Sequence, residues 1–162
     1  MPDRALLRIG GVSAILGSIL VLGLRILHPR ANMDVDPESA LRLVAESNVW
    51  VGDHVGTFFA VLLVTGGLVG LYRSITSGAG AAWARLGFAA ALVGTGVLLV
   101  YLGTDGIAWQ RVAESWVNAP EPEKASAFHA SLALYEINQA LLAIFFMGFF
   151  GVTFMLYGLA VA

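Results

Sequence analysis

Long uninterrupted apolar runs dominate this chain and leave little room for the alternation of apolar and charged positions typical of soluble helices. Four runs reach or approach the roughly twenty residues that an α-helix needs to cross a hydrocarbon layer about 30 Å thick. We expect spans at about residues 9–27, 50–72, 86–104 and 135–160. The pattern predicts an all-α polytopic membrane protein, with residues 1–162 forming a single domain of four transmembrane helices in an up-down-up-down bundle.

The two longer connections, which separate the first two and the last two runs, carry amphipathic patterns of their own. Residues 36–38 read Asp-Pro-Glu, an N-cap, a first-turn proline and an early acid, which predict a short helix to about Glu46. In the second connection, Asp105 is a candidate N-cap for a helix whose apolar stripe includes Trp109 and Trp116. We expect this second helix to lie in the membrane interface or over the mouth of the bundle.

Composition supports the membrane class and removes several functional classes. Apolar residues make up 58% of the chain and charged residues 12%, against about a quarter charged in a soluble domain. The net charge of −2 gives no basic surface for nucleic acid, so we expect no nucleic-acid partner. The chain has no cysteine, which excludes disulfides and thiolate ligands. Small residues spaced four apart, as in Gly66 and Gly70, predict close helix packing.

Basic residues near the ends of the spans predict the orientation. Arg4, Arg8, Arg73 and Arg85 lie in the N-terminal tail and the short middle loop, which the positive-inside rule assigns to the cytoplasm. We therefore expect a multi-pass protein of the cell membrane with both termini cytoplasmic and both longer loops outside, although Arg25 opposes this assignment. The last run reaches Ala162 with no basic residue after it, a pattern consistent with a longer natural chain.

Polar and ionisable side chains gather at the predicted outer end of the spans, at similar depths on all four helices. Such groups within a membrane span usually face the bundle interior and find a partner there. We expect Arg25 to pair with Glu136 or Asp105, or to extend to the lipid headgroups. The candidate ligand or metal residues are His54, His28, His129, Asp53, Asp105 and Glu136, with Arg25, Trp50, Thr57 and Gln139 in support.

Ordinary structural roles explain part of this set. Asp53 sits near the start of a helix, where the helix dipole favours an acid, and Trp50 fits the aromatic belt of a membrane protein. Asp105 is explained as an N-cap. His54 and Thr57 lie one turn deeper on the face of Trp50 and Asp53, and no local structural role accounts for them.

The sequence leaves three functions open. The first is an accessory or small-ligand-binding bundle with the polar cluster at its extracytoplasmic end. The second is a metal- or haem-binding protein, or an enzyme that uses the cluster, because histidine nitrogen with carboxylate oxygen suits Zn, Fe, Mn or Cu(II). The third is a small transporter or channel subunit. Expected partners are the lipid bilayer and a homo-oligomer or larger membrane complex; no motif names a catalytic residue or a family.

Overall fold

The computed structural model describes residues 4–162, and every regular element in that range is helical. The elements are α1 (Arg4–Leu27), α2 (Pro37–Glu46), α3 (Trp50–Ser74), α4 (Gly78–Gly103), the π-helical turn η1 (Thr104–Ala108), α5 (Trp109–Asn118), α6 (Glu121–Phe145), the π-helical segment η2 (Phe146–Thr153) and α7 (Phe154–Val161). Because η1 and η2 continue the helices on either side of them, α4 to α5 and α6 to α7 each form one long helix of 41 residues.

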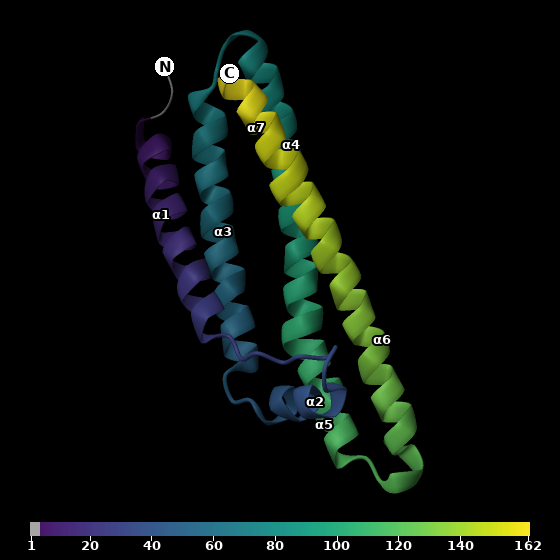
Figure 1. Cartoon of the computed structure of the whole chain (residues 1–162). Helices are drawn as coiled ribbons and strands as arrows, with labels where there is room; N and C mark the ends of the chain where they lie inside the picture. Colours follow the sequence, from purple (N-terminus) through teal and green to yellow (C-terminus); the bar gives the residue numbers. More distant parts are fainter. Residues whose placement is uncertain (1–3) are drawn as a thin grey trace.

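Four of the resulting helices are long and apolar enough to cross a membrane, with mean hydropathies of 2.0 to 2.1 over their most apolar windows. They alternate in direction, and the start of α1 and the C-terminus lie at the end of the molecule opposite α2 and α5 (Figure 1). The all-α, up-down-up-down prediction is therefore confirmed, and the four candidate spans suggest a multi-pass membrane protein.

Helix α2 begins where its capping residues predict. The Asp36 carboxylate accepts hydrogen bonds from the Ser39 hydroxyl at 2.7 Å and from the Ser39 amide at 3.1 Å. These bonds stabilise the charged form and hold the pKa of the exposed Asp36 carboxyl below its usual value of 3.8. Pro37 occupies the first turn, where its missing amide proton costs nothing, and the helix ends at Glu46 as expected.

Small residues bring the first two long helices into backbone contact. A Cβ added to Gly10 on α1 would lie 2.8 Å from the Gly70 Cα on α3, and one added to Gly17 would lie 2.7 Å from the Val64 nitrogen. Both distances are too short for any larger side chain, which confirms the close packing that the small-residue spacing predicts. In the same way, Gly94 on α4 receives the side chain of Phe149 from η2.

The long helices pack as a chain of neighbours rather than a closed ring. Helix α1 packs along α3, α3 along α4, and α4 along α6, η2 and α7. Within the part of the chain that the structure describes, α1 does not pack along α4 or α6. The two helical hairpins are therefore joined through α3 and α4, and their other side is open.

The end of the bundle remote from the C-terminus is covered by a cap formed by α2, α5 and the first turn of α3. Its buried core consists of Met33, Ala40, Leu41, Val44, Trp50, Trp109, Ala113 and Trp116. Trp50 is only 2% exposed, so its predicted place in an aromatic belt at the lipid interface is wrong. Helix α5 continues the α4 helix at this end and packs against α2 and α6.

Asp105 does not start a separate helix. It lies inside η1, in the middle of the continuous helix from Gly78 to Asn118, so its predicted role as an N-cap is wrong. The helices that hold the last two predicted spans are accordingly longer than residues 86–104 and 135–160.

Candidate functional site

The π-helical turn η1 brings α4 close to the start of α3. A π turn contains one residue more than an α turn and changes the direction of the side chains around it, and such turns are common at functional sites. Gly106 lies in this turn against His54, and a Cβ added there would overlap the His54 Cβ. The missing side chain at Gly106 therefore lets Asp105, its neighbour, reach His54.

His54 and Asp105 form the centre of a buried hydrogen-bond network. His54 Nδ1 donates to the Trp50 carbonyl at 2.8 Å, and His54 Nε2 lies 2.8 Å from Asp105 Oδ2. Tyr101 donates its hydroxyl to Oδ2 at 3.2 Å, and Asn138 Nδ2 donates to Oδ1 at 3.0 Å. The Trp50 indole also donates to the Asp105 backbone carbonyl at 2.9 Å. One carboxylate thus connects α3, the α4–η1 helix and α6.

A second histidine–aspartate pair lies beside the first, between the end of α1 and α3. His28, one residue beyond α1, places Nδ1 2.8 Å from Asp53 Oδ2. The Asp53 side chain is 10% exposed, and its other oxygen, Oδ1, is buried with no hydrogen-bond partner. Among the described residues, no partner is found for His28 Nε2. This pair is therefore only partly satisfied.

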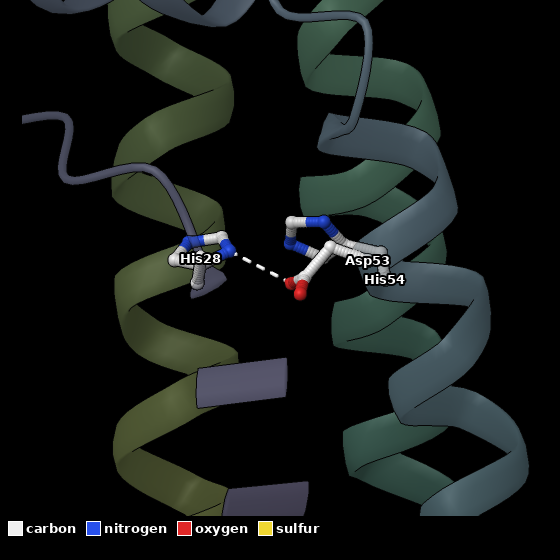
Figure 2. Close-up of side chains that lie close together, drawn as sticks. All are labelled: His28, Asp53 and His54. Atoms are coloured by element: carbon white, nitrogen blue, oxygen red, sulfur yellow. Dashed lines mark hydrogen bonds and ion pairs between the residues drawn. The ribbon is translucent and has the colours of Figure 1, made fainter. Parts of the chain in front are cut away.

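The two pairs meet at His28, Asp53 and His54. Each of these residues offers a metal-ligating atom, and the three atoms lie within 4.8 Å of one another. Figure 2 shows the three side chains converging from the end of α1 and from α3. The rings of His28 and His54 have centroids 5.1 Å apart, and the Trp50 ring lies about equally close to both, at 4.8 and 5.0 Å. We refer to these three residues as the His/Asp cluster.

Two further candidates lie away from this cluster. His129 and Glu136 are both exposed on α6, and His129 has its ring beside Phe128. Neither belongs to the group of candidate ligands that the structure brings together.

Arg25 does not form either of the ion pairs expected for it. Asp105 is paired with His54, Glu136 is exposed, and the structure gives the Arg25 guanidinium no hydrogen-bond or ion-pair partner among residues 4–162. Its side chain instead lines two adjoining cavities. The supporting candidates Gln139 and Thr57 line these cavities too, one in each.

The larger cavity, of 520 Å³, lies below the cap and is lined largely by polar side chains, among them Arg25, Arg30, Trp109, Tyr135 and Gln139. The smaller cavity, of 250 Å³, continues toward the middle of the spans along the apolar residues Val21, Leu98, Leu102, Leu142 and Phe146. Arg25, His28, Tyr101 and Leu142 line both. The His/Asp cluster therefore lies beside two adjoining cavities, one lined mainly by polar side chains and the other mainly by apolar ones.

Tyr101 is missing from the candidates that the sequence predicts, and of the polar pair Asn138 and Gln139 only Gln139 is among them. Tyr101 precedes Asp105 by four residues, which places both on one helix face and is the local signal that identifies it. Asn138 interrupts an apolar run next to Gln139. Adjacent helical residues point about 100° apart, so only one of the two faces inward, and the structure buries Asn138 completely.

The histidine positions do not fit a haem bound by both rings. A haem iron ligated by His28 and His54 needs the flat porphyrin between the two imidazoles. Here the rings contact each other edge to face at 5.1 Å, and Asp53 occupies His28 Nδ1. The geometry leaves no space for the macrocycle, whereas a single ion needs far less room.

Comparisons of this chain with protein-family models, with curated proteins and with solved structures find no match.

Proposed function

We propose that this multi-pass membrane protein binds one divalent transition-metal ion on His28, Asp53 and His54. The observation that carries the proposal is the convergence of three ligating atoms within 4.8 Å around a carboxylate that is only half satisfied. With the predicted orientation, this centre opens to the outer side of the membrane. The accessory role and the transporter or channel alternative stay predictions.

Asp53 supplies the first argument, because a buried carboxylate oxygen without a partner is costly. Oδ2 is engaged by His28, but Oδ1 accepts no hydrogen bond. Buried polar atoms are nearly always paired, and an exception calls for a missing water or ion. A cation beside Asp53 satisfies this oxygen.

The hydrogen bond at His54 Nδ1 supplies the second argument. A backbone carbonyl only accepts, so Nδ1 carries the proton in its bond to Trp50, and Nε2 is the nitrogen left for coordination. Metal-bound histidines usually donate their other N–H to a carbonyl or a carboxylate in this way. Nε2 now shares a proton with Asp105, and a metal ion at Nε2 takes the place of that proton.

Charge and distance supply the third argument. Asp53 and Asp105 together neutralise a dication, which matters where the membrane keeps the local dielectric low. Zinc binds nitrogen and oxygen at about 2.0 to 2.2 Å, so ligand atoms around a tetrahedral ion lie roughly 3.3 Å apart. The present separations, 2.8 Å between His28 and Asp53 and at most 4.8 Å in the cluster, bracket that value. Small side-chain rotations are enough to close the site.

Zinc titration of the full chain in detergent, after removal of metals with a chelator, tests the proposal. We expect one zinc ion per chain by elemental analysis. We also expect zinc at one hundred times its Kd to stabilise the protein by about 2.7 kcal/mol in thermal unfolding. His28→Ala and Asp53→Asn each remove a ligand and should weaken zinc affinity at least about tenfold.

His129→Ala is the matched control, because it removes a histidine that lies outside the cluster. It should bind zinc like the wild type. Thermal unfolding without zinc identifies any variant that fails to fold. Wild-type protein without stoichiometric zinc, or equal affinity in wild type and His28→Ala, contradicts the proposal.

A further inference from the structure

The two adjoining cavities beside the His/Asp cluster together offer a polar wall and an apolar wall, as an amphiphilic ligand requires. Their combined lining changes from arginine, tyrosine, glutamine and tryptophan near the cap to valine, leucine and phenylalanine toward the middle of the spans. Ligand pockets usually occupy about 300 to 1,000 Å³, and the larger cavity falls in that range with 520 Å³. We propose that this space binds one anionic phospholipid, with its headgroup phosphate at Arg25 and an acyl chain along Leu142 and Phe146.

Unpaired positive charge indicates the sign of the headgroup. Arg25 and Arg30 both line the larger cavity, and neither has an ion-pair partner among the described residues. The two carboxylates nearby are engaged, Asp53 by His28 and Asp105 by His54. An arginine within a membrane span is expensive unless it finds a partner. A phosphate provides one, because guanidinium and phosphate form strong, often bidentate, charge-assisted hydrogen bonds.

A buried donor without an acceptor supports the same ligand independently of charge. Trp109 is 3% exposed and lines the larger cavity, and its indole Nε1 has no hydrogen-bond partner. An indole N–H only donates, so it needs an acceptor oxygen. Tyr135 and Gln139, also on the cavity wall, add further donors. A headgroup rich in acceptor oxygens matches this set.

The open side of the helix arrangement gives such a lipid its route. Helix α1 packs along α3 and, over residues 4–162, not along α6, so the cavity lies between two hairpins that are not joined on that side. A lipid enters sideways from the bilayer and leaves its second chain among the surrounding lipids. This explains why a cavity of this size is sufficient for the headgroup and one chain.

Native mass spectrometry of the delipidated full chain tests the proposal with two lipids of identical chains, phosphatidylglycerol and phosphatidylcholine. We expect one phosphatidylglycerol to be retained and phosphatidylcholine to be lost. Arg25→Gln should weaken phosphatidylglycerol binding roughly ten- to hundredfold, because it removes a charged hydrogen-bond donor. Arg111→Gln, which removes an exposed arginine on α5 away from the cavities, is the matched control and should bind like the wild type.

Leu142→Trp provides a second variant that keeps all charges and fills the junction of the two cavities, and it should also abolish retention. Inorganic phosphate at millimolar concentration should not displace the lipid, because it lacks the chain. Equal retention of the two lipids, displacement by phosphate, or unchanged binding in both variants overturns the proposal. Zinc stoichiometry of Arg25→Gln should stay at the wild-type value, so this proposal and the metal proposal fail separately.

Discussion

The two histidine–aspartate pairs of this protein have the same chemistry and similarly buried aspartates, yet they differ in how completely they are bonded. The aspartate side chains are 10% and 8% exposed in the His28–Asp53 and His54–Asp105 pairs, and both pairs have a separation of 2.8 Å. Asp105 accepts hydrogen bonds from three side chains, whereas Asp53 accepts one and its Oδ1 has no hydrogen-bond partner. The histidines differ in exposure, at 17% and 5%, but the two aspartates are almost equally buried and are distinguished by their number of hydrogen-bond partners.

This difference separates a structural role from a binding role. The closed pair, His54–Asp105, ties together helices that are far apart in sequence. The open pair, His28–Asp53, connects only the end of α1 to α3 and keeps a buried oxygen free. A ligand gains most where the protein has left a polar atom unsatisfied. His54 belongs to the closed pair and also faces the open one, which makes it the link between the fold and the proposed metal centre.

The largest expected effect comes from deleting each carboxylate in turn. Asp105→Ala leaves His54, Tyr101 and Asn138 without their acceptor, and breaking a buried ion pair in this way costs about 3 to 5 kcal/mol. Asp53→Ala should cost about 1 kcal/mol, because one hydrogen bond is lost while an unsatisfied oxygen is removed. Thermal unfolding of metal-free protein in detergent measures both. Equal losses of stability refute the distinction between the pairs.

A smaller loss of stability is expected from a substitution at Gly106, where the backbone of η1 approaches His54 and so makes the closed pair possible. Gly106→Ala places a methyl group on the His54 Cβ and forces α3 away from η1, which should cost about 1 to 3 kcal/mol. Gly103→Ala is the matched control in the same helix, because nothing lies within 4 Å of its added Cβ. It should be neutral or slightly stabilising, since alanine favours helix more than glycine. Similar unfolding temperatures for the two variants are the result that contradicts this account of η1.

The fold follows from sequence because its signals are local. Apolar run length predicts the four long helices, and the Asp36 cap with Pro37 predicts the start of α2. The same local reasoning misplaces Asp105, because an acid before a polar segment looks the same whether it caps a helix or lies inside one. The hydrogen-bond partner of Asp105 distinguishes the two cases, and this partner, His54, is 51 residues away in the chain.

The candidate site was predictable in part for the same reason. The sequence singles out His54, His28 and Asp53 as polar residues at one depth, but depth does not say which side chains meet. The pairing of Asp105 with Asn138 spans 33 residues and depends on the rotation of α6, which neighbouring Gln139 leaves ambiguous. Whether Asp53 Oδ1 has a hydrogen-bond partner depends on all of the helices around it. No pattern in the local sequence predicts that a buried oxygen has no hydrogen-bond partner.

A third carboxylate, Asp36, is exposed and can be compared with the two buried aspartates. Its titration is the smallest of the expected effects. Its hydrogen bonds to Ser39 lower its pKa below 3.8, so its capping contribution is complete above that pH and is lost as the pH falls through the lower, folded-state pKa. The Ser39 amide resonance in micelles should therefore titrate with a midpoint below 3.8. Asp36→Asn keeps the cap without a charge and should abolish this titration, whereas Asp34→Asn should leave it unchanged. A midpoint at or above 3.8 means that the cap does not favour the charged carboxylate. In that case two hydrogen bonds are too little to hold an exposed acid in its charged form, which counts against the view that the number of partners decides what each carboxylate in this protein does.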